Sequence, residues 1–453
     1  MNLPNYFIAD LPPEATLTPT LIAEACQTLK RNREQYLANR TTPELIRRLS
    51  DVAENWLDGE YPFRKLALAE GPKVTGFSAA TLASGLDAFF RQITAENLRA
   101  LLVQDLGHAQ RLDEPCASNA ELVLRRSAMV NGPEFLVHIA AGSLPVPVFM
   151  SIILGLLVRS AQFVKCAHGT SLLPRLFAHS LYEADPKLAS CLEIADWRGG
   201  NHALEDALFK EADCVTGTGS DETLAKIRQH VPARARFLAY GHRVSFGYVT
   251  AEALAGFNSK KIAMRAAADV AAWNQLGCLS PHVIYVEHGG GVTAEQFAEL
   301  LAQELGKLEE TAPRGELPTE SAAVIASRRA FYEVRAAHSP ETRHWRSENS
   351  TAWTVVYEAD PIFQLSCLNR FIYVKACTDL KQALQGAESV RGHVSTVGLA
   401  ATEERSTAMV AELSRWGVTR VCPLGKMQEP PLLWRHDGRP SLADLVTWTD
   451  WEQ

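Results

Sequence analysis

The first part of the chain has the hydrophobic pattern of amphipathic helices. Between residues 20 and 49, apolar side chains recur every three or four positions among charged ones, so one face of each helix can cover a core. Pro43 interrupts this pattern, because proline lacks an amide hydrogen and disfavours a helical residue before it. We therefore predict two helices in this stretch and a helix-rich opening third.

From about residue 135, short apolar runs alternate with helical patterns. The predicted strands are 135–139, 162–165 and 213–216, and the predicted helices are 148–160, 172–183 and 221–230. Helices between consecutive strands are typical of a parallel sheet with crossover connections. This part of the chain is therefore predicted to be an α/β lobe.

The same alternation starts again beyond residue 241. Helices are predicted at 259–275, 294–308 and 322–335, and strands at 282–286, 353–357, 370–375 and 394–399. The predicted fold class is α/β, with two Rossmann-type lobes. We expect the helical N-terminal region and the first lobe to span residues 1–240, the second lobe 241–420, and a tail that returns to the first lobe 421–453.

Composition excludes several classes of protein. The 453 residues are 47% hydrophobic and 21% charged, as in ordinary globular proteins. The formal net charge of −7 argues against a nucleic-acid-binding protein, which needs clustered lysine and arginine. The most apolar run, 144–158, is shorter than the roughly 20 residues of a membrane span. Since the N-terminus shows no secretory signal pattern, we expect a cytoplasmic location without a membrane span.

The nine cysteines do not form a framework. Their number is odd, they are scattered along the chain, and none belongs to a Cys-x-x-Cys pair. This pattern fits neither a set of disulfides nor a zinc site, so reduced thiols and no metal are expected.

Cys278 stands out because of its local context. It follows a predicted helix and precedes a strongly apolar predicted strand, at a junction where a backbone amide can face a substrate carbonyl. A thiolate is both a good nucleophile and a good leaving group, so a thioester can form and break readily there. The alternative is a small buried side chain without chemistry.

A glycine-containing turn follows the predicted strand at 213–216. Thr218, Gly219 and Ser220 lead into the predicted helix, and Thr223 lies in its first turn. Free amides and the positive end of the helix dipole favour a pyrophosphate, so these residues are candidates for binding a cofactor. The third glycine of the dinucleotide fingerprint is missing, and an ordinary turn capped by serine would look the same.

Lys165 ends the predicted strand at 162–165. Ligands of open α/β sheets gather at the carboxyl ends of the strands, where a lysine can pair with a nucleotide phosphate. The alternative is a solvated lysine without a ligand.

These features occur in an order that resembles the aldehyde dehydrogenase superfamily. In that family a strand ending in Val-Lys precedes a Thr-Gly-Ser turn and then a nucleophilic cysteine, as Val164-Lys165, Thr218-Gly219-Ser220 and Gly277-Cys278 do here. More narrowly, the chain is similar to the acyl-CoA reductases related to the fatty acid reductase subunit of bacterial luminescence, over about residues 100–453. The segments that carry this similarity are Trp197-Arg198-Gly199-Gly200, residues 275–282, Leu368-Asn369-Arg370-Phe371 and residues 435–440, followed by Leu442 and Leu445.

The resemblance implies a function. It implies an aldehyde dehydrogenase-like fold with a cofactor lobe, a catalytic lobe and a small oligomerisation element. The implied reaction is the reduction of an acyl thioester, on CoA or on a protein and with a fatty acyl group, to the aldehyde through acyl-Cys278. A homo-oligomer and an acyl-activating synthetase partner are also implied. The alternatives are a CoA-acylating aldehyde dehydrogenase that works in the oxidative direction and a catalytically silent acyl-binding subunit.

The chain departs from ordinary aldehyde dehydrogenases at three places. Residues 238–245 contain no carboxylate where the family carries the glutamate that activates water, so hydrolysis is not expected, although His242 could act as a base there. Ser143 stands where the family places an asparagine over the oxyanion. NAD-selective relatives carry a glutamate three residues after the strand-end lysine, whereas residue 168 is histidine, so NADPH is expected rather than NADH. The alternative for His168 is a plain helix cap.

Overall fold

The computed structural model describes the whole chain except residues 1–2, 13, 141, 143, 257 and 453. The chain divides into two compact units. The first unit comprises Met1–Thr75, Leu86–Gly241 and Pro431–Gln453, and the second comprises Gly76–Gly85 and His242–Pro430. Among the described residues, no helix combines the length and the apolar character needed to cross a membrane.

The first unit is built on five parallel strands in the order β4-β3-β2-β5-β6. Their bounds are Phe135–Ile139 for β2, Ala161–Cys166 for β3, Leu192–Asp196 for β4, Cys214–Thr218 for β5 and Arg236–Tyr240 for β6. The chain starts at β2, adds β3 and β4 on one side, and then adds β5 and β6 on the other. The direction of winding therefore changes between β2 and β5, and open sheets bind ligands at the carboxyl ends of such strands.

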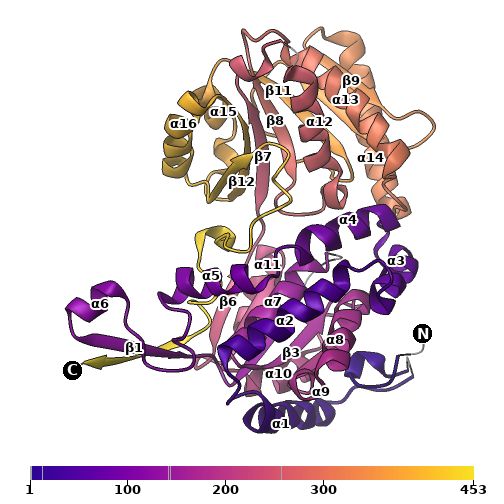
Figure 1. Ribbon diagram of the computed structural model, residues 1–453. Helices are drawn as coiled ribbons and strands as arrows, with labels where there is room; N and C mark the ends of the chain where they lie inside the picture. The colour runs from indigo at the N-terminus through magenta and orange to yellow at the C-terminus, as the bar shows by residue number, and fades with distance from the viewer. Residues whose placement is uncertain (1–2, 13, 141, 143, 257, 453) are drawn as a thin grey trace. The chain divides into compact units, whose positions relative to one another are not determined.

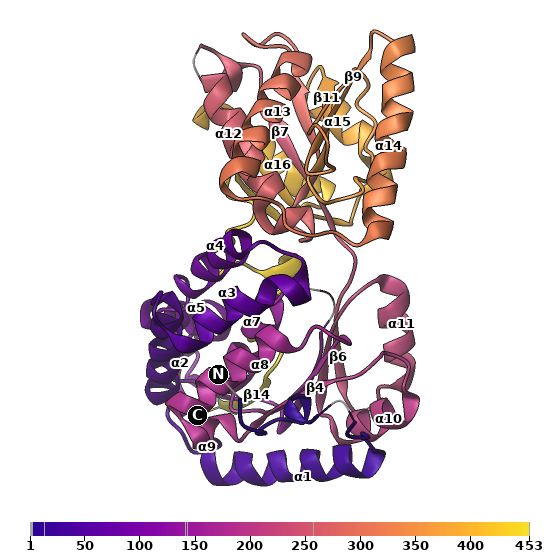
Figure 2. The ribbon, with the colours of Figure 1, turned by 90° about the vertical axis from the view of Figure 1, so that its right-hand side faces the viewer.

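Helices cover both faces of this sheet (Figures 1 and 2). Side chains of β2 alternate, so that Phe135 and Val137 pack with α1 and α10, while Leu136 packs on the other face with Leu154 of α7. The helices of the unit are α1 Pro19–Tyr36, α2 Thr42–Leu57, α3 Pro62–Thr75, α5 Ala95–Leu106, α6 Asn119–Val123, α7 Val146–Leu157, α8 Leu172–Ala184, α9 Pro186–Ala189, α10 His202–Glu211 and α11 Asp221–His230, with short 3-10 turns at Ile8–Asp10 and His436–Gly438. Helix α4, Ala79–Phe90, crosses from the second unit into the first.

The predicted division of the opening helices is confirmed. Pro43 lies in the first turn of α2, where its missing amide hydrogen costs nothing, and Thr41 caps this helix by accepting from the Glu44 amide. Helix α1 ends at Tyr36, six residues before α2 begins.

Two further strands of the first unit form an antiparallel arm. Strand β1, Arg126–Asn131, pairs with β14, Thr447–Glu452, and Figure 1 shows the pair beside α6. All six residues of β14 are exposed. The arm therefore has a surface that the described residues leave open to solvent.

The second unit contains seven strands in the order β13-β12-β7-β8-β11-β10-β9. All neighbours are parallel except β9 and β10. The strands are β7 Val244–Val249, β8 Pro281–Glu287, β9 Thr342–Arg346, β10 Thr354–Glu358, β11 Phe371–Cys377, β12 Val394–Ala400 and β13 Arg420–Pro423. Like the first sheet, this one is buried on both faces.

Helices α12 and α13 cover one face of this sheet, and α14, α15 and α16 cover the other. Val283 and Tyr285 of β8 face α14 and α15, while Ile284 and Val286 face α12 and α13, as expected for alternating side chains. The bounds are α12 Asn258–Ala271, α13 Ala294–Thr311, α14 Thr319–His338, α15 Leu380–Gly386 and α16 Glu403–Trp416, with 3-10 turns at Glu252–Leu254, Ala272–Gln275 and Glu388–Val390.

The observed units differ from the expected boundaries in two places. The returning tail begins at Pro431 rather than at residue 421, because β13 extends the second sheet and the residues after it bind α12. Gly76–Gly85 join the second unit, where Phe77 and Gly85 pack against Trp273.

The helix predicted over 259–275 is wrong at its end. Helix α12 stops at Ala271, and the next residues form a 3-10 turn in which Trp273, Asn274 and Gln275 have φ angles of 50°, 51° and 64°. The pattern of apolar residues does not reveal the end of the α-helix, because Trp273, Asn274 and Gln275 in the 3-10 turn are buried like the helical residues before them.

Candidate active site

Cys278 lies on a tight turn between the 3-10 segment and β8. The Ser280 amide donates to the Gly277 carbonyl at 2.9 Å and closes this turn, which we call the nucleophile turn, Gly277 to Ser280. Cys278 is exposed, whereas the other eight cysteines are buried or partly buried, and all nine are free thiols. Of the nine, Cys278 is therefore the thiol best placed to meet a substrate.

Burial suppresses ionisation of the other cysteines. It raises the pKa of Cys26, Cys166, Cys191 and Cys377 to about 12. It also raises the pKa of Cys214, Cys367 and Cys422 to about 11, and that of Cys116 above its ordinary value. These eight side chains are neutral thiols at neutral pH and poor nucleophiles.

The approach to the nucleophile turn is a strained run of left-handed residues. Trp273, Asn274 and Gln275 all have positive φ, which costs about 1–2 kcal/mol for each residue with a side chain. Packing and hydrogen bonds hold the run: the Trp273 ring lies edge-on to Phe77, and the Asn274 side-chain amide donates to the Arg314 carbonyl at 2.7 Å. Strain of this kind gathers at functional sites.

A second left-handed run lies before β11. Leu368, Asn369 and Arg370 have φ angles of 63°, 57° and 66°. The side-chain amide of Gln275 donates to the Pro281 carbonyl at 2.7 Å and to the Phe371 carbonyl at 2.9 Å, so it ties the two runs together. The sequence similarity at residues 368–371 thus marks a support of the nucleophile turn.

Three further side chains surround the nucleophile turn, and sequence reasoning missed all of them. The Ser245 hydroxyl donates to the Cys278 carbonyl at 2.7 Å, and the Gln428 side-chain amide donates to the Ser280 hydroxyl at 2.8 Å. Burial lowers the pKa of the Arg420 guanidinium, and the electrostatic influence of Cys422, Asp269 and Cys278 opposes that shift. Their separation from Cys278 along the chain leaves no local signal.

His242 lies at the same edge of the second sheet as Cys278. Ser245 pairs with Pro281 across the parallel strands β7 and β8. His242 lies three residues before Ser245 (245 − 242), and Cys278 lies three residues before Pro281 (281 − 278). Both residues therefore come just before the amino ends of neighbouring parallel strands. Burial, and then the charge of exposed His242, lower the pKa of His282 to about 4.

Tyr240, in the same carboxylate-free stretch, belongs to the first unit. Its ring stacks on His436 with 4.7 Å between centroids, and the Arg439 guanidinium lies 4.5 Å from the ring centroid. The tail segment 435–440 therefore packs over the end of β6.

Lys165 is a buried lysine at the carboxyl edge of the first sheet. It ends β3 at the carboxyl edge of the first sheet, it is 5% exposed, and its ammonium lies 5.8 Å from the Trp197 ring centroid. Burial lowers its pKa, and the structure gives its ammonium no hydrogen bond with a described residue. The Trp197 indole nitrogen is also buried without a partner in the described chain. The unpartnered indole nitrogen and the strand-end ammonium have the chemistry to bind the ribose and phosphate of a nicotinamide cofactor, and this role stays a prediction.

His168 is exposed and pairs with a carboxylate that sequence reasoning missed. Its Nδ1 lies 3.0 Å from Oδ1 of Asp196, and Oδ2 of Asp196 accepts from the Gly169 amide at 2.9 Å. Asp196 ends β4, directly before the Trp197-Arg198-Gly199-Gly200 segment. His168 is therefore held in the loop after β3 by an acidic neighbour.

The turn after β5 is organised as a helix cap. Ser220 accepts from the Thr223 amide at 3.2 Å, and the two hydroxyls lie 2.9 Å apart. The Gly219 amide donates to the Tyr240 carbonyl at 3.2 Å, and Thr218 ends β5 beside them. The alternative of a capped βα turn thus accounts for the two hydroxyls, and their role toward a cofactor stays a prediction. Ser143, the other predicted site residue, lies outside the described residues.

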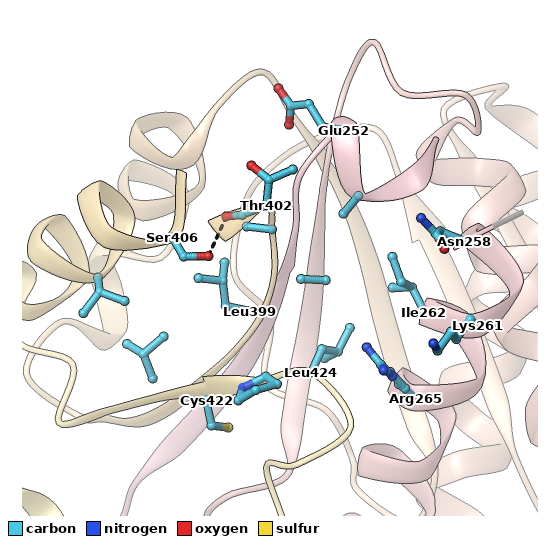
Figure 3. Close-up of a pocket in the computed structure, with 16 residues that line it drawn as sticks. Glu252, Asn258, Lys261, Ile262, Arg265, Leu399, Thr402, Ser406, Cys422 and Leu424 are labelled. Carbon is cyan, nitrogen blue, oxygen red and sulfur yellow. Dashed lines mark hydrogen bonds between the residues drawn. The ribbon is translucent and has the colours of Figure 1, made fainter. Parts of the chain in front are cut away.

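A separate cavity of about 520 Å³ is shown in Figure 3. It lies at the carboxyl edge of the second sheet, opposite to the edge of Cys278. It is bounded by the last residues of β12 and β13 and by segments that follow β7 and β12, with Lys261 and Arg265 of α12 on one wall. Cys278 precedes β8 and so lies at the amino edge. None of the predicted site residues lines this cavity.

Comparison with known proteins identifies the family. The model of the family described as "Acyl-CoA reductase (LuxC)" matches residues 37–448. Long-chain acyl-protein thioester reductase 2 of Photobacterium leiognathi is 23% identical over 441 residues, which cover 95% of this chain and 85% of that protein. The long-chain acyl-protein thioester reductase of Aliivibrio fischeri is 22% identical over 420 residues, 90% of this chain and 82% of that protein.

Solved structures agree on the fold. Betaine aldehyde dehydrogenase from Staphylococcus aureus superposes with a TM-score of 0.67 at 14% identity, covering 96% of this chain and 88% of that chain. A bifunctional proline utilization A protein gives a TM-score of 0.71 at 16% identity, covering 96% of this chain and 45% of that chain. The predicted α/β fold class is confirmed, and a reductase of this family and fold works with a nicotinamide cofactor. The chain belongs to the acyl-CoA reductase (LuxC) family and is an acyl reductase with the aldehyde dehydrogenase fold.

Proposed function

We propose that this protein reduces a long-chain acyl thioester to the aldehyde, with Cys278 as the acylated nucleophile. The observation that carries the proposal is that Cys278, alone among the nine cysteines, is exposed, and that it lies on a turn held from several sides. Two relatives are long-chain acyl-protein thioester reductases, which supports a fatty acyl thioester as substrate.

The first half of the reaction is a thioester exchange. The Cys278 thiolate attacks the carbonyl carbon of the acyl donor, and negative charge develops on the carbonyl oxygen, where the backbone amide of Cys278 can stabilise it. The bond to the carrier sulfur then breaks, and the carrier thiolate leaves with the electron pair and takes up a proton. One thioester replaces another, so the step needs no further energy source.

NADPH is the cofactor that the residues favour. We assign its phosphate and ribose groups to Lys165 and to the Trp197 indole nitrogen, which lies buried without a partner in the described chain. His168 stands where NAD-selective relatives carry a glutamate that would repel a 2′-phosphate. When it is bound, the reduced nicotinamide supplies the hydride that converts the acyl group to the aldehyde.

Hydrolysis of the acyl enzyme is disfavoured by the residues near β7. Residues 238–245 provide no carboxylate to activate water, and His242 is the remaining candidate base in that stretch. Acyl-Cys278 is therefore expected to persist until it is reduced.

The arm formed by β1 and β14 is the element that we propose for self-association. Trp448 and Trp451 of β14 are 42% and 54% exposed, and residues 122–124 beside the arm are 63–83% exposed. Exposed apolar patches of this kind mark contact surfaces. A second copy of the chain is the occupant that the family resemblance implies, together with an acyl-activating synthetase as a further partner. A cytoplasmic location also stays part of this proposal.

The proposal is tested by trapping the acyl enzyme. Incubation with hexadecanoyl-CoA without cofactor should add one acyl mass that neutral hydroxylamine removes, and NADPH should then release hexadecanal. Cys278→Ala should lose both the adduct and turnover, while Cys116→Ala, at a partly buried cysteine, should keep them. An adduct that survives in Cys278→Ala would contradict the assignment, and tight binding without an adduct would favour a silent acyl-binding subunit. The preferred direction is measured by comparing two rates: the oxidation of hexadecanal with CoA and NADP⁺, and the reduction of hexadecanoyl-CoA with NADPH.

A further inference from the structure

Ser245 is completely buried at the start of β7, next to irregularities in both neighbouring strand pairs. In the pairing with β8, Ser245 lies opposite Pro281 and Phe246 opposite Val283, which leaves one extra residue in β8. In the pairing with β12, the register skips from Val394 to Thr396. Bulges of this kind re-aim side chains and occur next to active sites.

The Ser245 hydroxyl joins two segments. It accepts a hydrogen bond from the Thr396 amide at 3.1 Å and donates to the Cys278 carbonyl at 2.7 Å. The bulge in β12 thus leaves an amide that the serine satisfies, and the serine proton is directed at the nucleophile turn. Both hydrogen-bonding functions of the hydroxyl are used.

Two hydrogen bonds fix the two peptide planes on either side of the Cys278 α-carbon. The Cys278 carbonyl belongs to the peptide between Cys278 and Leu279, and Ser245 holds it. The Cys278 amide belongs to the peptide between Gly277 and Cys278, whose carbonyl accepts from the Ser280 amide at 2.9 Å. Because a trans peptide is planar, a fixed carbonyl also fixes the direction of the amide in the same plane.

Ser280 is itself held from the far side of the turn. Its hydroxyl accepts from the Gln428 side chain at 2.8 Å. Gln428 belongs to a loop that the buried carboxylate of Asp269 anchors through the amides of Gly425 at 2.5 Å and Met427 at 2.9 Å. The nucleophile turn therefore has one support from β7 and another from the loop after β13.

We propose that Ser245 is a positioning residue, which fixes the peptide plane after the Cys278 α-carbon. Its counterpart is Gln428, which holds Ser280, whose amide fixes the plane before that α-carbon. Together they keep the amide and the thiol of Cys278 aligned on the acyl carbonyl. This inference rests on the proposed function, because it concerns the acylation of Cys278. Ser245 does not touch the substrate. Its role is to hold the backbone that follows the Cys278 α-carbon in place while the sulfur attacks.

The experiment separates acylation from alkylation of the same thiol. Acylation by hexadecanoyl-CoA develops an oxyanion, whereas iodoacetamide forms a carbon–sulfur bond and releases iodide without one. Ser245→Ala should slow the acylation of Cys278 by about 10- to 100-fold, the range expected when an oxyanion donor or the reacting geometry is disturbed. Alkylation of Cys278, followed by peptide mass spectrometry, should be unchanged. Ser245→Thr, which keeps the hydroxyl, should restore most of the acylation rate.

Ser395→Ala is the matched control. Ser395 is also fully buried, on β12 beside Thr396, but its hydroxyl has no hydrogen-bond partner in the described chain. In the Ser395→Ala variant, Cys278 should be acylated at the same rate as in the unmodified protein.

If Ser245→Ala does not fold, the Gln428 variants decide. Gln428 is only partly buried, so its replacement leaves the core intact. Gln428→Leu should slow acylation about tenfold, and Gln428→Glu, which can accept from the Ser280 hydroxyl, should slow it less.

Two results would overturn the positioning role: acylation of Ser245→Ala at the unmodified rate, or acylation and alkylation that fall together. Failure of the unmodified protein to form any acyl-Cys278 would instead overturn the proposed function.

Discussion

Replacing Gly85 with alanine tests how far the strained approach to Cys278 depends on packing from α4. A Cβ added at Gly85 would lie 2.0 Å, 2.4 Å and 2.6 Å from three atoms of the Trp273 ring. Carbon atoms in contact are about 3.5–4.0 Å apart, so the ring must move by about 1.5 Å. Trp273 begins the left-handed run, and the displacement reaches Cys278 through Asn274 and Gln275.

The magnitude follows from two opposing effects. Overpacking in a core costs about 1–3 kcal/mol, and an overlap this severe belongs at the upper end. Alanine gains up to about 1 kcal/mol over glycine within a helix. The free energy of unfolding of Gly85→Ala should therefore fall by about 2 kcal/mol, and acylation of Cys278 should slow about tenfold because its geometry is disturbed.

Gly306→Ala is the matched control for this substitution. Gly306 also lies within a helix, α13, but the atom nearest to an added Cβ is 3.7 Å away, in the Trp353 ring. This variant should be as stable as the unmodified protein or up to about 1 kcal/mol more stable. Urea denaturation and the rate of acylation by hexadecanoyl-CoA are measured for both variants. If Gly85→Ala matches Gly306→Ala in both, the packing of Trp273 does not hold the nucleophile turn.

Three further predictions concern the cofactor, water and pH. His168→Glu should lower kcat/KM with NADPH more than with NADH, because the new carboxylate repels the 2′-phosphate. The control His168→Gln adds no charge beside Asp196, so a loss seen in it as well would come from a disturbed loop. An equal loss of kcat/KM with both cofactors in His168→Glu would count against the NADPH assignment. His242→Glu should speed hydrolysis of hexadecanoyl-CoA and lower the aldehyde yield, while rapid release of fatty acid by the unmodified protein without cofactor would show that a base is already present. Burial lowers the pKa of His138 from 6.5 to about 4, so its contribution to stability is present above pH 6.5 and is lost as the pH falls toward 4, by about 2 kcal/mol between pH 7 and pH 5. Urea denaturation at both pH values should show a smaller loss for His138→Gln than for the unmodified protein, and no such change for His338→Gln at an exposed histidine.

Local patterns predicted the central elements of the fold well. Residues 135–139 and 221–230 were predicted as a strand and a helix, and β2 and α11 have these bounds. A buried strand is a continuous apolar run, and α11 begins at a serine cap with two acidic residues in its first turn, so both signals lie within the element itself.

The arm could not be predicted in this way. β1 pairs Arg126 with Glu452, across more than 300 positions of the sequence, and β14 is exposed along its whole length. Neither strand has the apolar run or the strict alternation that marks a half-buried strand. Pairing of this kind depends on the rest of the first unit to bring the two segments together.

The sequence predicts single residues of the candidate site, but not the side chains that hold them in place. The context of Cys278 and Lys165 can be read from the few residues around each, because a nucleophile or a strand-end cation sits at a junction between elements. The Ser245 hydroxyl reaches Cys278 across 33 residues, and the Gln428 side chain reaches Ser280 across 148. Serine and glutamine are common surface residues, so only the tertiary structure distinguishes these two from the others.

The stretch from Leu238 to Ser245 connects these observations. Ordinary aldehyde dehydrogenases, which the chain resembles, use the corresponding stretch to provide a carboxylate that activates water. Here it provides no carboxylate, and its last residue, Ser245, donates to the Cys278 carbonyl instead. A neutral serine hydroxyl is too weakly basic to deprotonate water, and this one already donates its proton to the Cys278 carbonyl. We therefore expect this stretch to support the Cys278 backbone through Ser245 and, with His242 as its remaining candidate base, to let acyl-Cys278 hydrolyse only slowly.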